Sequence, residues 1–151
     1  MKKGKAKLPL AFWDTSAIIP LCCRQPQSTR CRQVSRQFSG LVVWWGTSVE
    51  ATSAFCRLNR QGIFSNTHLK QSQIILDALR LRWHEIQPLD EVRQEAERVL
   101  HLHALRGADA LQLAAALVWC SKNTKGRHFV CADQNLLNAA SREGFITIDV
   151  N

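Results

Sequence analysis

Short apolar runs of strand composition alternate with longer segments of helical periodicity along this chain. The runs span residues 8–13, 41–45, 128–132 and 145–149, with a weaker candidate at 84–87. Helices are expected at residues 28–38, 48–60, 66–83, 90–105, 108–121 and 134–142. Apolar strands separated by helices favour a mainly parallel sheet that helices cover on both faces. The sequence therefore predicts the α/β fold class.

The chain has the length and composition of one ordinary globular domain. Its 151 residues are 46% hydrophobic and 21% charged, which is typical of globular rather than disordered sequences. Residues 1–7 are expected to form a basic tail before a single domain at 8–151, because the following apolar stretch is too short for a signal peptide. No apolar stretch approaches the roughly 18 residues of a membrane span. We therefore expect a soluble, cytoplasmic protein.

The six cysteines do not form a recognisable metal-binding or disulfide pattern. They lack a C-x-x-C pair and a histidine at the spacing of a zinc ligand. Cys56, Cys120 and Cys131 lie in apolar stretches, where a free cysteine behaves as a small hydrophobic residue. The pattern favours buried thiols in a reducing compartment.

A surplus of basic residues makes nucleic acid the first partner to consider. Twenty Lys and Arg against twelve Asp and Glu give a net charge of +8, which attracts polyanions before any specific contact forms. A basic rim for phosphates is one interpretation of the arginines, and a set of solvated helix faces is the other: Arg24, Arg30, Arg32, Arg36, Arg57, Arg60, Arg80, Arg82 and Arg106. Charge alone does not identify a function, so a site is needed.

Acidic residues stand where the predicted strands end and the predicted helices begin. Asp14 and Asp133 each follow an apolar strand directly. Glu50 lies in the first turn of the helix after the second strand, and Asp109 begins the apolar helix at 108–121. Ligand sites of open α/β sheets gather at the carboxyl edge of the strands. We therefore expect four carboxylates to converge at that edge.

Clustered carboxylates repel one another and are costly to desolvate, so a hard divalent cation with oxygen ligands stabilises them best. Mg²⁺ or Mn²⁺ would polarise a phosphoryl group and activate water, which suits hydrolysis of a phosphodiester. A structural interpretation stays open for each residue, because an Asp at a helix start is an ordinary N-cap and Glu50 favours the helix dipole. Asp109 fits that interpretation least, since its apolar neighbours predict partial burial.

Four segments carry these residues in a suggestive order. They are Phe12-Trp-Asp-Thr-Ser-Ala-Ile-Ile19, Thr47-Ser-Val-Glu-Ala51 with Arg57-Leu58, Leu105-Arg-Gly-Ala-Asp-Ala-Leu-Gln-Leu-Ala114, and Phe129-Val-Cys-Ala-Asp-Gln-Asn-Leu-Leu137. In this order and spacing they resemble the motifs of PIN-domain ribonucleases, and within them the VapC-type toxins of toxin–antitoxin pairs. The likeness spans nearly the whole chain. The chain departs from the family at Cys131 and Ala132, where the family often has Thr before the last Asp.

The resemblance implies a fold and a catalytic site. The fold would be a three-layer α/β/α arrangement around a mainly parallel sheet. Asp14 and Asp109 would bind Mg²⁺ or Mn²⁺ with help from Glu50 and Asp133, while Ser16 or Thr15 would support the metal shell by hydrogen bonding. The activity would be endonucleolytic hydrolysis of single-stranded or structured RNA. Apart from the resemblance, Arg106 is a candidate RNA contact because it adjoins the motif that carries Asp109.

The resemblance also implies partners. A VapC-type toxin would form a homodimer and would be inhibited by a small cognate antitoxin that masks the acidic pocket. The pair would bind its promoter DNA only through the antitoxin. None of these partners follows from composition or spacing.

The remaining aromatic and histidine residues receive no catalytic role. Trp44 and Trp45 favour core or dimer contacts over platforms for base stacking. His101 and His103 fall on a predicted helix without a partner pattern.

Two other functions are alternatives to a nuclease. One is a PIN-like domain that binds RNA or a protein without cutting, which dependence on a metal would separate from the nuclease. The other is a phosphatase of another α/β family, but the sequence lacks the D-x-D-x-T nucleophile motif and a Gly-rich phosphate loop.

Overall fold

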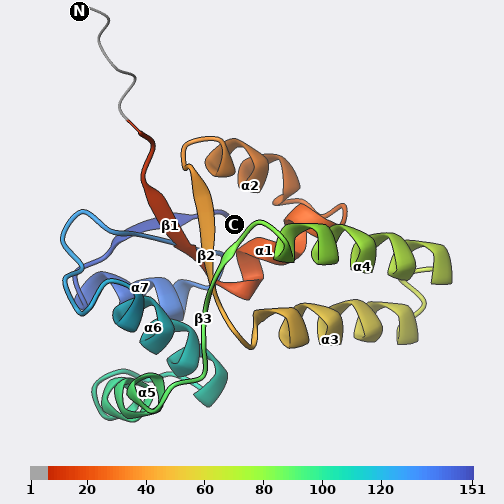
Figure 1. The fold of residues 1–151 in the computed structure, drawn as a ribbon. Helices are drawn as coiled ribbons and strands as arrows, with labels where there is room; N and C mark the ends of the chain where they lie inside the picture. Colours follow the sequence, from red (N-terminus) through yellow and green to blue (C-terminus); the bar gives the residue numbers. More distant parts are fainter. Residues whose placement is uncertain (1–6) are drawn as a thin grey trace, which may run out of the picture.

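A parallel five-stranded sheet forms the centre of the protein. The structure is a computed structural model and describes residues 7–151. The strands are β1 (Leu10–Trp13), β2 (Gly40–Trp44), β3 (His84–Ile86), β4 (His128–Cys131) and β5 (Ile146–Asp149), in the order β3-β2-β1-β4-β5 (Figure 1). The helices are α1 (Thr15–Cys22), α2 (Ser28–Ser35), α3 (Thr47–Arg60), α4 (Asn66–Arg80), α5 (Asp90–Leu102), α6 (Gly107–Trp119) and α7 (Gln134–Arg142).

The register of the central strands aligns their carboxyl ends. Phe12 of β1 pairs with Val42 of β2 and with Phe129 of β4, and all four strand pairs are parallel. The backbone N–H of Asp14 donates to the carbonyl oxygen of Val130 at 2.9 Å, which extends the pairing by one residue. Segments that follow β1, β2 and β4 therefore leave the sheet at one common edge.

The sheet separates two hydrophobic cores. Successive side chains of a strand point to opposite faces, so Trp13 packs into the core on the side of α1–α4, while Phe12 packs into the core on the side of α5–α7. Figure 1 shows α1, α3 and α4 on one side of the sheet and α5, α6 and α7 on the other. The protein is thus a three-layer α/β/α structure.

Helix α6 is the central helix of the second layer, as its apolar sequence predicts. Its buried residues surround the helix nearly completely: Ala110, Gln112, Leu113, Ala114, Ala115, Ala116 and Leu117. A helix that is apolar on most of its surface has to be covered by protein on several sides. Helix α5 covers α6 from outside, and the sheet lies beneath it (Figure 1).

The α/β class, the parallel sheet and the predicted strands are confirmed, with shifts of one or two residues at their ends. Helix α1 was not predicted. Its sequence, Thr-Ser-Ala-Ile-Ile-Pro-Leu-Cys, is short and contains β-branched residues and an internal Pro20, all of which disfavour a helix locally. The Asp14 cap and the buried face of α1 outweigh these local preferences.

The cysteines and tryptophans divide between core and surface. All six cysteines are free thiols, and Cys120 and Cys131 are buried as predicted, but Cys56 is only half-buried. Trp44 lies in the core, whereas Trp45 is 47% exposed. No helix within residues 7–151 is long and apolar enough to cross a membrane. The basic tail predicted for residues 1–7 lies almost entirely outside the described residues.

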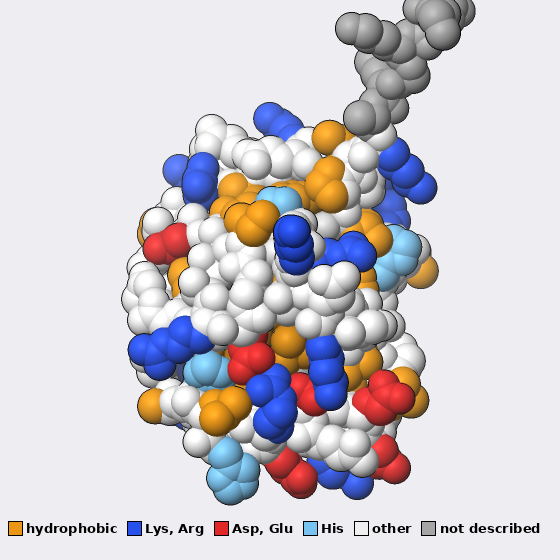
Figure 2. Space-filling view, turned by 90° about the vertical axis from the view of Figure 1, so that its left-hand side faces the viewer, with side chains coloured by type: hydrophobic (Ala, Val, Ile, Leu, Met, Phe, Trp, Pro, Cys, Tyr) orange, Lys and Arg blue, Asp and Glu red, His pale blue; other side chains and the backbone are white. Residues whose placement is uncertain are grey.

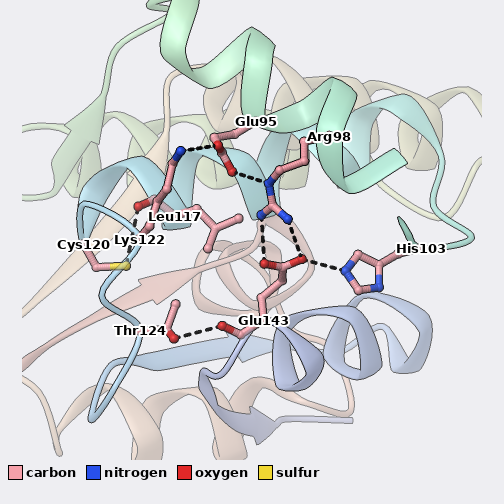
Figure 3. A network of polar contacts seen from close by, with 8 residues as sticks. All are labelled: Glu95, Arg98, His103, Leu117, Cys120, Lys122, Thr124 and Glu143. Carbon is pink, nitrogen blue, oxygen red and sulfur yellow. Dashed lines mark hydrogen bonds and ion pairs between the residues drawn. The ribbon is translucent and has the colours of Figure 1, made fainter. Parts of the chain in front are cut away.

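A network of ionic contacts joins the helices of the second layer (Figure 3). Glu143, which follows α7, accepts hydrogen bonds from both terminal nitrogens of Arg98, and it contacts His103 Nε2 at 2.8 Å. Arg98 also pairs with Glu95, which in turn pairs with Lys122 at 2.8 Å. This network ties α5 to α7 and to the segment that follows α6.

The basic surplus is not gathered into one patch on the face shown in Figure 2. Lys and Arg side chains are scattered over this side of the molecule, and in its lower part Asp and Glu stand among them. A mixed surface of this kind gives weak, long-range attraction for a polyanion rather than a defined groove.

Candidate active site

Asp14 lies at the carboxyl end of the central strand. It is the N-cap of α1, and its Oδ2 accepts a hydrogen bond from the backbone N–H of Ser16 at 3.0 Å. The residue is only 5% exposed. Burial raises the pKa of Asp14, and hydrogen bonds from Ser16 and Cys131 do not offset this effect.

Glu50 lies in the first turn of α3, the helix that follows β2 in the chain. Its Oε1 accepts a hydrogen bond from Gln112 Nε2 at 3.2 Å. Burial and the charge of Asp14 raise the pKa of Glu50 to about 7, although hydrogen bonds with Gln112 and Thr15 lower it in part. Glu50 can therefore exchange a proton near neutral pH.

Asp109 and Asp133 lie at the starts of α6 and α7, two helices of the opposite layer. Asp109 is half-buried in the first turn of α6. Its pKa is raised by burial and then by the charges of Asp14 and Asp133, while Arg106 lowers it. Asp133 is exposed and caps α7, where its Oδ1 accepts a hydrogen bond from the backbone N–H of Leu136 at 2.8 Å.

These four residues, here called the acidic cluster, are brought together at one edge of the sheet. Asp14 raises the pKa of both Glu50 and Asp109, and Asp133 raises that of Asp109, so their charges lie within electrostatic range. Within residues 7–151, however, no three Asp, Glu, His or Cys side chains are grouped tightly enough to hold a metal ion unaided. The acidic cluster is open rather than a closed ligand cage.

The capping interpretation of the two aspartates is confirmed, and it does not exclude a second role. Capping engages Oδ2 of Asp14 and Oδ1 of Asp133. The hydrogen bonds of residues 7–151 leave the other oxygen of each carboxylate unused. Each side chain can therefore cap its helix and still present one oxygen to a ligand.

Ser16 and Thr15 hold the frame around the acidic cluster. The Ser16 hydroxyl accepts a hydrogen bond from the backbone N–H of Ala132 at 2.9 Å, which joins α1 to the segment after β4. The Thr15 hydroxyl accepts one from Gln112 Nε2 at 2.7 Å. Both residues thus fix the positions of the elements that carry Asp14, Asp133 and Asp109.

Gln112 is a site residue that sequence reasoning did not single out. It is fully buried, and its Nε2 lies 2.7 Å from Thr15 Oγ1, 3.3 Å from Thr47 Oγ1 and 3.2 Å from Glu50 Oε1. Its Oε1 is buried without a hydrogen-bond partner among the described residues. The available signal was a polar side chain three positions after Asp109, on the same face of an otherwise apolar helix.

Cys131 is the second residue that the sequence did not identify as part of the site. Its Sγ lies 3.7 Å from Asp14 Oδ2 and accepts a hydrogen bond from the backbone N–H of Asp133 at 3.2 Å. Burial raises the pKa of this thiol, so it stays protonated. The side chain is a neutral donor beside Asp14, at a position where the resemblance led us to expect a hydroxyl.

Arg106 acts electrostatically on the acidic cluster. It is exposed at the N-cap of α6, and its charge lowers the pKa of Asp109. Arg57 of α3 lines a cavity that also includes Ser16. The other arginines of the predicted rim include Arg24 and Arg32, which line a separate cavity at the end of α1.

Comparison with solved structures identifies the fold. PAE2754 from Pyrobaculum aerophilum is similar over 95% of this chain and 92% of its own, with a TM-score of 0.60 and 19% sequence identity. FitAcB from Neisseria gonorrhoeae is similar over 93% of this chain and 97% of its own, with a TM-score of 0.63 and 14% identity. No protein-family model matches the chain, and no curated protein does at a significant level.

At 19% and 14% sequence identity, these two likenesses establish the fold alone. The chain shares the arrangement of elements of both neighbours over almost its whole length. The three-layer α/β/α arrangement around a mainly parallel sheet, which the resemblance implies, is therefore confirmed.

Proposed function

We propose that this protein is a metal-dependent endoribonuclease that hydrolyses phosphodiester bonds in RNA, and that it acts as the VapC-type toxin of a type II toxin–antitoxin pair. The observation that carries the proposal is the acidic cluster. Four separate segments each bring one carboxylate to the same sheet edge, where the charge of Asp14 raises the pKa of both Glu50 and Asp109 and the charge of Asp133 raises that of Asp109. Such mutual repulsion is unfavourable unless a cation offsets it.

The chemistry of the side chains fits a hard divalent cation. All four side chains offer carboxylate oxygens, the ligands that Mg²⁺ and Mn²⁺ prefer. Asp14 and Asp109 would hold the ion, with Glu50 and Asp133 completing its surroundings. When bound, the ion would polarise the phosphoryl group and lower the pKa of an attacking water.

The protein's own groups would do the rest of the chemistry. Glu50, held through Oε1 by Gln112, would present Oε2 to the ion. Asp133, with one free oxygen, can orient water. Arg106 beside Asp109 can contact the substrate phosphate, as a guanidinium does well.

The decisive test is cleavage of a mixed RNA pool by the Asp109→Asn variant. We expect wild-type protein to cut RNA with Mg²⁺ or Mn²⁺ but not with EDTA, and we expect Asp109→Asn to be inactive. Asp90→Asn is a matched control, because Asp90 also lies in the first turn of a helix but is exposed on α5.

The outcomes separate the proposed nuclease from a binding module. Retained cleavage in folded Asp109→Asn protein would remove Asp109 from the site. A folded, metal-loaded wild-type protein that binds RNA without cutting any member of the pool would instead favour the non-catalytic PIN-like module.

The partners of the proposed toxin follow from the same assignment. We propose a homodimer whose acidic cluster is masked by a small antitoxin, which alone would contact promoter DNA. The fold shared with FitAcB supports this reading. Size-exclusion chromatography with light scattering would measure the oligomeric state, and a mass consistent only with a monomer would contradict the dimer.

A further inference from the structure

A cavity of about 300 Å³ opens beside the acidic cluster and has no role in the chemistry described above. Six of its lining residues are Ser16, Gln25, Gln27, Arg57, Ala132 and Asn151. We propose that this cavity is a nucleobase subsite, which binds the base of a nucleotide next to the scissile phosphate and gives the enzyme its sequence preference. The proposal rests on the proposed RNA-cleaving function.

The cavity shares a wall with the acidic cluster. The backbone N–H of Ser16 donates to Asp14 Oδ2 at 3.0 Å, while the Ser16 hydroxyl accepts from the backbone N–H of Ala132 at 2.9 Å. Ala132 precedes Asp133 directly. A phosphate placed against Asp14 and Asp133 would therefore have an adjoining nucleotide at the mouth of this cavity.

The polar groups of the cavity match the edge of a base. Gln27 Nε2 donates to Asn151 Oδ1 at 3.0 Å. That contact leaves the side-chain atoms Gln27 Oε1 and Asn151 Nδ2 free of further hydrogen bonds within residues 7–151. The side-chain amide of Gln25 is likewise free within these residues. Base edges present donors and acceptors side by side, and amide side chains are the groups that pair with them.

The remaining surface of the cavity suits a flat, partly apolar ligand. Its walls also include Ile19 from α1 and Leu58 from α3, which can pack against the faces of a ring. Arg57 is exposed at the side and can contact a neighbouring phosphate. The volume lies at the small end of ligand pockets, which span about 300–1,000 Å³, so it accommodates one base rather than a folded RNA element.

The first experiment measures binding and is independent of cleavage. Short single-stranded RNAs that carry one abasic nucleotide at successive positions are titrated against the Asp109→Asn protein by fluorescence anisotropy. We expect one position at which loss of the base weakens binding about tenfold, the size of a well-formed contact to a base edge. That sensitivity should vanish in Asp109→Asn protein that also carries Gln27→Leu.

Gln33→Leu is the matched control, because Gln33 is an exposed glutamine of α2 outside the cavity. It should leave the sensitive position unchanged. The proposal is overturned if no position is sensitive to base removal, or if the same position stays equally sensitive after Gln27→Leu.

The second experiment sequences the cut ends of an RNA pool. Wild-type protein should show a base preference at one position near the cut, and Gln27→Leu protein should cut with that preference reduced. Cleavage by Gln27→Leu protein with unchanged preference contradicts the subsite and leaves the nuclease standing. Abasic sensitivity that depends on Gln27, in a protein that cuts no RNA, supports the subsite and counts against the nuclease.

Discussion

Gln112 links the apolar helix α6 to two other helices through one amide group. The helices are α1, through Thr15, and α3, through Thr47 and Glu50. The three acceptors share two amide hydrogens, so the contacts act as one unit rather than as three independent bonds. An apolar side chain of similar size would keep the packing but leave these acceptors without their donor.

We expect Gln112→Leu to lower the free energy of unfolding by about 1–3 kcal/mol, the cost of leaving buried polar groups unpaired. Urea denaturation at pH 7 would measure this difference, and Gln94→Leu on the exposed face of α5 is the control. Equal stability of wild type and Gln112→Leu would show that the amide contributes nothing net.

Glu50 gives the folded protein a characteristic response to pH. Its pKa of about 7 lies above its unfolded value of 4.5, so the folded state binds more protons between these values. Stability therefore falls as pH rises from about 4.5 through 7, by on the order of 2 kcal/mol for this residue. Burial raises the pKa of Asp14 and Asp109 as well, which acts in the same direction.

We expect Glu50→Gln to be more stable than wild type above pH 7 and to lose part of this pH dependence. Urea denaturation in EDTA at pH 5 and pH 8 would test it. A wild-type protein whose stability rises between these two values, with no difference from Glu50→Gln, would contradict the raised pKa.

At the scale of residues, the sequence predicted the acidic cluster better than its surroundings. Asp14, Glu50, Asp109 and Asp133 could be located because each directly follows a strand or begins a helix. Gln112 and Cys131 could not, because their role depends on contacts between segments far apart in the chain, such as Cys131 with Asp14.

Helices α5 and α7 are joined by an ion-pair network whose two carboxylates, Glu95 and Glu143, are largely shielded from solvent. The Glu143 side chain is 13% exposed and receives two hydrogen bonds from Arg98 (Figure 3). Burial alone would raise the pKa of Glu143, but hydrogen bonds from Arg98 and His103 and their charges lower it below its usual value. Its contribution to stability is therefore present above the unfolded pKa and is lost as pH falls through the folded pKa.

We expect Glu143→Gln to lower the free energy of unfolding by about 1–3 kcal/mol at pH 7, because it leaves Arg98 and His103 without their charged partner. The difference should shrink in acid, where wild-type Glu143 is itself protonated. Denaturation at pH 7 and pH 3 would show this, with the exposed Glu97→Gln as control. A difference that grows in acid would contradict the lowered pKa.

Helices with strong hydrophobic periodicity could be predicted from the sequence, whereas α1 could not. Helix α1 carries Pro20 and adjacent isoleucines, so local propensity argued against it. What forms the helix is the Asp14 cap together with Ala17 and Ile18, which are buried against the sheet. Tertiary contacts of this kind cannot be read from a short segment.

The net charge of +8 has a measurable consequence for the whole molecule. If RNA binds through phosphates, affinity falls with salt, with a slope of about −0.7 per neutralised phosphate for single strands. We expect Arg57→Gln to reduce the magnitude of that slope by about 0.7. Titration of a short RNA with Asp109→Asn protein at several salt concentrations would measure it, and Arg93→Gln on α5 is the control. Identical slopes would remove Arg57 from the interface.

The order of strands in the sheet determines when the acidic cluster can assemble during synthesis of the chain. Strand β1, which precedes Asp14, lies between β2 and β4, and β4 is made more than a hundred residues later. A nascent chain therefore has a sheet with an unpaired edge and an acidic cluster without Asp133 until the ribosome has added residue 133. The four carboxylates can therefore meet only after β4 has paired with β1, so assembly of the acidic cluster waits for the last of its four segments to be made.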